Sequence, residues 1–174
     1  MVYNKIAKKG FTLMELLVTV VIVSILASYA VYHYTNIMDE GRVNAAKGKL
    51  SGLGGATARF LLENAENVST DCGYGDDGIS LEAYMSDPQY QACRGEMNDL
   101  QHYMLDVIQC GYAERSLVRD AYYDYYIGCP GAHGCGNLNR VTAYMRVKGD
   151  FAGNANFPAC VFFDPTTDRV EEVN

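Results

Sequence analysis

The sequence has no tryptophan, only three histidines and no pair of cysteines at CxxC spacing. Without such pairs it carries neither the paired ligands typical of a structural zinc site nor a haem-attachment motif. The histidines, His33, His102 and His133, form no recognisable nucleophile–base arrangement, and no glycine-rich phosphate loop is present. We therefore expect no metal site, no cofactor and no enzymatic activity.

Positive charge is also scarce. Lys and Arg number 14 against 21 Asp and Glu, a net charge of −7. Lys5, Lys8 and Lys9 all precede Gly10, so removing the first ten residues leaves 11 Lys and Arg against 21 acids, a net charge of −10. An acidic body has no general electrostatic attraction to nucleic acid, and we expect no such partner.

Charged side chains are missing altogether from Leu16 to Met38. About 20 apolar residues suffice for a helix to cross a bilayer, so this run predicts a membrane-spanning helix. Basic residues flank only its N-terminal side, and the positive-inside rule therefore places that side in the cytoplasm and the body outside the inner membrane. Glu15 is conspicuous at the start of the run, because a charge at bilayer depth is costly.

A helical pattern continues beyond the apolar run. Residues at alternating spacings of three and four predict one buried stripe, made by Val43, Ala46, Leu50, Leu53, Thr57 and Phe60. The same stretch contains several glycines, which favour a flexible linker as the alternative. We expect a helix, because the stripe keeps its phase across the glycines.

The rest of the chain predicts loops, short helices and then strands. Residues 64–80 are rich in Gly, Asp and Ser, and short helices are expected at Leu81–Met85 and Met97–Gln109. Strands are expected at Tyr122–Ile127, Val141–Lys148, Cys160–Phe163 and Arg169–Val173, with a turn at Asp164–Asp168. The tyrosines of the first strand alternate, so one face is expected to pack on the helix and the other to serve as a subunit interface. The predicted fold class is α+β, a long N-terminal α-helix packed on an antiparallel β-sheet head.

All six cysteines follow the apolar run: Cys72, Cys93, Cys110, Cys129, Cys135 and Cys160. An even number in an exported body predicts a disulfide framework, and the sequence does not choose among its pairings. Two aspartate pairs, Asp76 with Asp77 and Asp164 with Asp168, lie in turn-rich segments. Turn formation explains them more simply than calcium binding does.

The segment Lys8-Lys9-Gly10-Phe11-Thr12-Leu13-Met14-Glu15 resembles the class III signal of type IV prepilins and pseudopilins. The resemblance implies cleavage after Gly10 by prepilin peptidase, N-methylation of Phe11 and a role for Glu15 in assembly. It also implies a leader of residues 1–10, a transmembrane and filament-core helix of 11–38, an amphipathic continuation of 39–63 and a disulfide-containing head of 64–174. Tyr32 stands where many relatives carry a proline, so filament models of those relatives do not transfer in detail.

The implied function is that of a structural subunit of a type IV pilus-like surface filament. It would be held by lipid in the inner membrane before assembly and be extracellular afterwards. Its implied partners are copies of itself, prepilin peptidase and an inner-membrane assembly platform. A pseudopilin of a type II secretion system is the alternative within the family. Outside the family stand a membrane-anchored exported ligand-binding domain and a soluble protein released by signal-peptide cleavage after Ala30.

Overall fold

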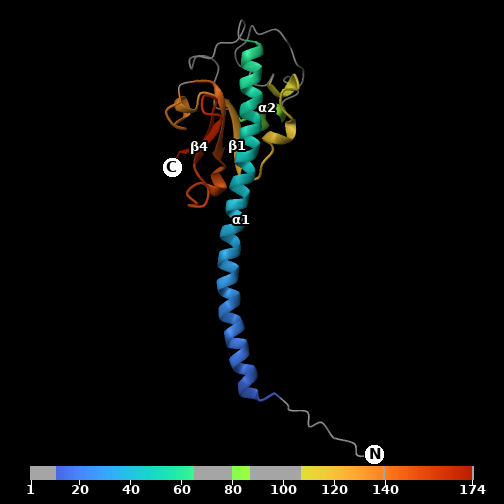
Figure 1. Cartoon of the computed structure of the whole chain (residues 1–174), viewed down its shortest axis with the longest axis vertical. Coiled ribbons are helices and arrows are strands. Elements are labelled where there is room, and N and C mark those ends of the chain that lie inside the picture. The colour runs from blue at the N-terminus through green and yellow to red at the C-terminus, as the bar shows by residue number, and fades with distance from the viewer. Residues whose placement is uncertain (1–10, 65–79, 87–106, 139, 174) are drawn as a thin grey trace, which may run out of the picture. The chain divides into compact units, whose positions relative to one another are not determined.

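The computed structural model describes residues 11–64, 80–86, 107–138 and 140–173 (Figure 1). The chain divides into two compact units, Met1–Asp39 and Glu40–Asn174. The predicted leader, Cys72, Cys93, His102 and the Asp76–Asp77 pair lie outside the described residues.

Helix α1 runs without interruption from Leu13 to Glu63, so the linker alternative is wrong. Within the second unit, its buried residues include every member of the predicted stripe: Val43, Ala46, Leu50, Leu53, Thr57 and Phe60. The spacing of these residues therefore identified the side of α1 that packs on the rest of the second unit. Gly54 is buried on the same side, and the ring of Phe163 lies where a side chain at this position would project.

In the described part of the chain, four strands form one antiparallel sheet in the order β1-β2-β3-β4. Sequential strands are neighbours throughout, as in a meander. The strands are β1 Tyr123–Gly128, β2 Thr142–Val147, β3 Cys160–Asp164 and β4 Arg169–Val173. The α+β prediction and all four predicted strands are confirmed, with end points that differ by one residue at most.

Short helices also occur in the described part of the second unit. Helix α2, Leu81–Ser86, confirms the helical turn expected there. Only residues 107–109 of the helix predicted at Met97–Gln109 are described, and they are helical. Among the residues that the structure describes, three 3-10 helices follow, η2 Arg115–Val118, η3 Pro130–His133 and η4 Gly149–Phe151, and none of them was predicted.

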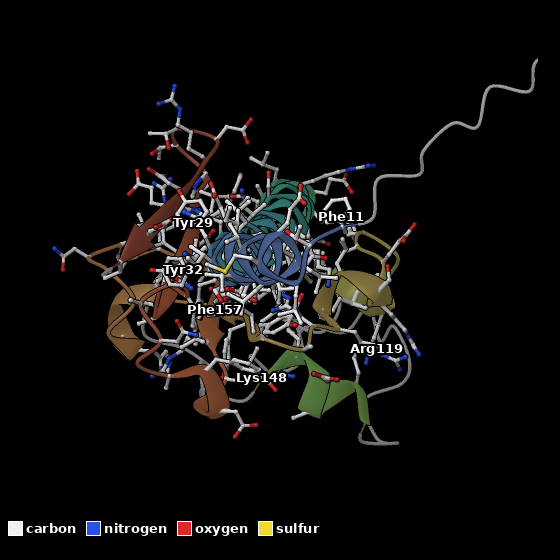
Figure 2. The ribbon with its side chains drawn as sticks, turned by 90° about the horizontal axis from the view of Figure 1, so that it is seen from below. Phe11, Tyr29, Tyr32, Arg119, Lys148 and Phe157 are labelled. Atoms are coloured by element: carbon white, nitrogen blue, oxygen red, sulfur yellow. A yellow bond between two sulfur atoms is a disulfide. The ribbon has the colours of Figure 1, made fainter. Side chains whose placement is uncertain are left out.

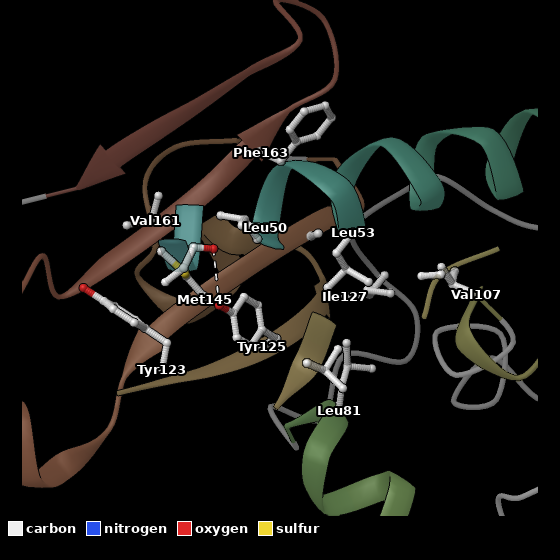
Figure 3. Packing of buried hydrophobic residues seen from close by; sticks show 14 of the residues in the cluster. Leu50, Leu53, Leu81, Val107, Tyr123, Tyr125, Ile127, Met145, Val161 and Phe163 are labelled. Atoms are coloured by element: carbon white, nitrogen blue, oxygen red, sulfur yellow. Dashed lines mark hydrogen bonds between the residues drawn. The ribbon is translucent and has the colours of Figure 1, made fainter. Parts of the chain in front are cut away.

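One face of the sheet packs on α1 (Figure 3). Tyr123 and Tyr125 in β1 are both 0% exposed on this face, as alternation along the strand predicted. The opposite face forms a second cluster, in which Tyr126 stacks on Tyr144 with ring centroids 4.9 Å apart. Cys135 joins this second cluster from the segment after η3, so side chains of the chain itself cover part of the face expected to meet another subunit.

Asp120 fixes the start of β1 to α1. One carboxylate oxygen accepts hydrogen bonds from the backbone N–H groups of Tyr122 and Tyr123, at 2.9 and 3.3 Å. The other lies 2.7 Å from Nζ of Lys49 in α1. Asp120 was not among the predicted residues, although an Asp two residues before a backbone donor is a common turn signal.

Candidate functional site

The first unit presents a continuous apolar surface on the N-terminal part of α1. Its large apolar side chains are exposed from Phe11 to Met38, with Leu13 at 85% and Ile25 at 65%. Helix α1 is long enough and apolar enough to cross a membrane. Its most apolar stretch of 18 residues is not buried by any other part of the described chain. A surface of this size on a protein in water needs a cover, either lipid or another protein.

Thr12 caps the start of α1. Its hydroxyl oxygen accepts a hydrogen bond from the N–H of Glu15 at 3.3 Å, and its carbonyl accepts one from the N–H of Leu16 at 3.2 Å. Thr-x-x-Glu is the spacing of a capping box, which places Glu15 in the first helical turn. A carboxylate there faces the positive end of the helix dipole. This role of Thr12 was not predicted, although the Thr-x-x-Glu spacing is visible in the sequence.

Glu15 follows Phe11, which precedes the helix, by four residues. Phe11 directly precedes the capping residue and is 73% exposed. No ion pair joins the Glu15 carboxylate to any residue that the structure describes. The carboxylate is therefore available to a cation from outside the described chain. Gly10, the predicted cleavage residue, lies outside the described residues.

The hydroxyl groups within the apolar run bond to the helix itself. Thr19 donates to the carbonyl of Leu16 at 2.8 Å, and Ser24 donates to that of Val20 at 2.7 Å. Ser28 donates to the carbonyl of Ser24 at 2.9 Å. Because these donors are satisfied inside the helix, they add little cost when lipid or apolar protein surrounds it.

Aromatic side chains gather near the end of the apolar run. The ring centroids of Tyr29 and His33 lie 4.3 Å apart, and those of Tyr32 and His33 lie 5.7 Å apart. Tyr29 and Tyr32 are labelled in Figure 2, which looks along α1. Tyrosines at this position are typical of the boundary between lipid and water.

The second unit contains the described cysteines. Cys135 is disulfide-bonded to Cys160, with Cα atoms 5.5 Å apart, which is within the usual range for such a bond. Cys110 and Cys129 are disulfide-bonded as well. The Cys135–Cys160 bond ties the segment after η3 to β3. The predicted participation of Cys72 and Cys93 stays a prediction.

Asp164 stabilises the turn of the last hairpin. The Asp164 carboxylate accepts hydrogen bonds from the hydroxyl and the N–H of Thr166, at 2.6 and 2.8 Å. These bonds lower the pKa of Asp164, and the bond from the Thr166 hydroxyl has the largest effect. Among the residues that the structure describes, no group of three or more His, Cys, Asp or Glu side chains is placed to hold a metal ion.

Comparisons with known proteins match the N-terminal part of the chain. The family described as "Prokaryotic N-terminal methylation motif" matches residues 6–31. The chain is 35% identical to the type II secretion system core protein G of Pseudomonas aeruginosa over 81 residues, 47% of this chain and 52% of that protein. It is 39% identical to a fimbrial protein of Pseudomonas aeruginosa over 64 residues, 37% of this chain and 42% of that protein.

The chain thus spans about half the length, or less, of the curated relatives that it matches, 52% and 42%. No solved structure matches it significantly. The matched family segment contains Gly10, Phe11 and Glu15, and the relatives are a pilus protein and a secretion-system protein. In its methylation motif, its long N-terminal helix and these similarities, the N-terminal part of the chain is thus similar to type IV pilins and pseudopilins.

Proposed function

We propose that the chain is a structural subunit of a type IV pilus-like surface filament and has no enzymatic activity. The observation that carries this proposal is the exposed apolar surface of α1 between Phe11 and Met38, with Glu15 as its one carboxylate. Lipid of the inner membrane covers this surface before assembly. The same part of α1 in neighbouring subunits covers it in the filament, where close helix packing replaces lipid contacts.

Cleavage of the leader gives Glu15 a partner. Prepilin peptidase cuts after Gly10, which creates an ammonium group at Phe11 that keeps its positive charge after N-methylation. An unpaired ion is costly in a low-dielectric filament core, and a close pair offsets part of that cost. The Glu15 carboxylate of one subunit therefore pairs with the Phe11 ammonium of its neighbour, and this pairing sets the axial register of the helices.

Processing and assembly take the subunit from the inner membrane to the cell surface. The subunit waits in the inner membrane with its second unit outside, is passed to an inner-membrane assembly platform, and ends in an extracellular filament. Disulfides suit this location, because the second unit folds in an oxidising compartment.

Terminal analysis of the mature protein tests the proposal. Mass spectrometry is expected to find a mature chain that starts at N-methylated Phe11, and electron microscopy to find surface filaments that contain it. A start at Val31 would identify an ordinary signal peptide. A start at Met1 would identify a plain membrane anchor of an exported ligand-binding domain.

A pseudopilin of a type II secretion system is the second candidate, and the 35% identity to secretion core protein G favours it. The two functions differ in what the cell loses. Deletion of the gene is expected to abolish surface filaments while exported enzymes still reach the medium. The reverse result would establish the pseudopilin function instead: the exported enzymes stay inside the cells, and the surface filaments are unchanged.

A further inference from the structure

An open groove lies beside β4, on the face of the sheet that turns away from α1. Its apolar lining includes Leu138 and Phe162, and its volume is about 470 Å³. Three carboxylates line it, from Asp164, Glu171 and Glu172, and no basic side chain of the described residues does so. We call this hollow the β4 groove. Its apolar floor and acidic rim suit the stem and the head of a long basic side chain.

Glu171 is the carboxylate of the β4 groove that remains available. Glu172 forms an ion pair with Lys47, and the Asp164 carboxylate accepts two hydrogen bonds from Thr166. Glu171 is exposed and has no ion pair with any residue in the described part of the chain. Phe162 holds its place in the floor, because it is only 6% exposed and lies next to Cys160, which is bonded to Cys135.

Two exposed arginines lie at the start and just past the end of η2, after the exposed Glu114. Arg115 and Arg119 are both exposed, and neither makes an ion pair with a residue that the structure describes. The segment that carries them is fixed, because Val118 is 0% exposed and Leu117 lies against α1, with its Cδ1 3.7 Å from the Cβ position of Gly52. We call this the η2 surface.

The β4 groove and the η2 surface lie on opposite sides of the second unit. Figure 1 shows β4 on one side of α1 and the yellow segment that contains η2 on the other, and Figure 2 places Arg119 away from the strands. Side chains on the two surfaces therefore do not reach each other within one molecule. A contact between them requires two copies, and such a head-to-tail contact builds an open filament when the rotation between copies does not close a ring.

We infer that the β4 groove of one subunit receives the η2 surface of another copy of this chain, with Arg119 facing Glu171. This inference rests on the proposed filament and adds a contact between second units to the contact between N-terminal helices. The occupant is a second copy because the chain itself supplies the complementary charge. The guanidinium of Arg119 contacts the acidic rim of the β4 groove, while the methylene groups of the same side chain lie against Phe162.

Charge reversal in the full chain tests the contact. Arg119→Glu and Glu171→Arg are each expected to reduce the yield of sheared filaments at least about threefold, because attraction becomes repulsion at every repeat. The two substitutions together are expected to restore the yield to within about twofold of the unsubstituted chain. Arg140→Glu is the matched control, since Arg140 is exposed and belongs to neither surface; its filaments should stay at the ordinary yield.

Covalent coupling supplies a second readout. Arg119→Lys introduces an amine that a zero-length carbodiimide joins to a carboxylate in contact with it. Filaments are expected to yield a linked peptide pair containing positions 119 and 171, which subunits dispersed in detergent lack. Filaments that show no link and tolerate both reversals would overturn the inference. Losses in both single variants without rescue or link would identify another protein as the occupant and also overturn it. If the unsubstituted chain forms no filaments, the proposed function itself fails.

Discussion

The hydroxyl of Tyr125 in β1 donates a hydrogen bond to the backbone carbonyl oxygen of Ala46 in α1 at 3.2 Å. Both residues are 0% exposed. Burial, with a smaller contribution from the charge of Asp120, raises the pKa of Tyr125, so the hydroxyl keeps its proton throughout the physiological range. A strand and a helix far apart in the sequence are thus joined by one directional bond inside the apolar core.

Tyr125→Phe is expected to lower the free energy of unfolding by about 1 kcal/mol, the usual net value of such a bond. Ala46 loses only this additional donor, because its carbonyl also serves the helix. Denaturant unfolding of the full chain in detergent, followed by near-ultraviolet circular dichroism, measures the change. Tyr34→Phe is the control, since Tyr34 is 63% exposed and its loss should leave the midpoint unchanged. Equal midpoints for all three proteins would contradict the role of the bond.

Two glycines of α1 are expected to respond to alanine in opposite directions. A Cβ at Gly54 would lie 2.7 Å from Cβ of Phe163, whereas nothing lies within 4 Å of a Cβ at Gly48. Overpacking costs about 1–3 kcal/mol and exceeds the gain in helix propensity, so Gly54→Ala should destabilise. Gly48→Ala should stabilise by up to about 1 kcal/mol. The same unfolding experiment compares them, and destabilisation by both would mean that the helix needs glycine for another reason.

The architecture was predictable where one stretch of sequence carries the whole signal. The stripe from Val43 to Phe60 keeps a helical period, and the four strands are short runs of Tyr, Val and Phe between turn residues. Both patterns reflect burial of one face, which acts on neighbouring residues together. The prepilin-like signal at Gly10 and Phe11 is also local, so the resemblance to prepilins was recognisable from it.

Contacts between distant segments were not predictable. Lys49 and Asp120 are 71 residues apart, and Cys135 and Cys160 are 25 apart. Their pairing depends on how α1, the loops and the sheet come together, which no periodicity encodes. The η2 surface and the β4 groove could not be predicted from the sequence for the same reason, because each is assembled by tertiary packing around a short segment.

The carboxylate of Glu63 is expected to titrate below its ordinary pKa of 4.5. Tyr112 donates its hydroxyl to Glu63 at 2.6 Å and Arg59 donates its Nε–H at 2.8 Å, and both bonds lower the pKa of Glu63. The folded pKa lies below the unfolded one, so the stabilisation is complete above the unfolded pKa and is lost as pH falls through the folded pKa. Carbon-detected NMR titration should show Tyr112→Phe raising the pKa of Glu63. An unchanged pKa would mean that Tyr112 does not hold this carboxylate in solution.

Removal of the Cys135–Cys160 bond is expected to destabilise the second unit. The bond spans 25 residues, for which the loop-entropy model gives about 3.5 kcal/mol. Cys135→Ser combined with Cys160→Ser removes it without leaving a free thiol that would exchange with other disulfides. Thermal unfolding of the full chain measures the loss, and non-reducing mass spectrometry of the unsubstituted chain should find three disulfides. Free thiols in the exported protein would contradict the framework.

Glu15→Ala is expected to leave leader cleavage intact and to reduce the filament yield at least about tenfold, because an ammonium group without a partner in the filament core costs several kcal/mol. Glu15→Gln keeps the shape and the hydrogen-bonding capacity of the side chain but not the charge, so it should fail as well if charge pairing sets the register. Glu40→Ala is the matched control, an exposed acid of α1 in the second unit. Mass spectrometry of the N-terminus and electron microscopy read out cleavage and assembly separately. Normal filaments from Glu15→Gln would show that the side chain acts by hydrogen bonding in the first turn beside Thr12, and the charge-pair mechanism would have to be abandoned.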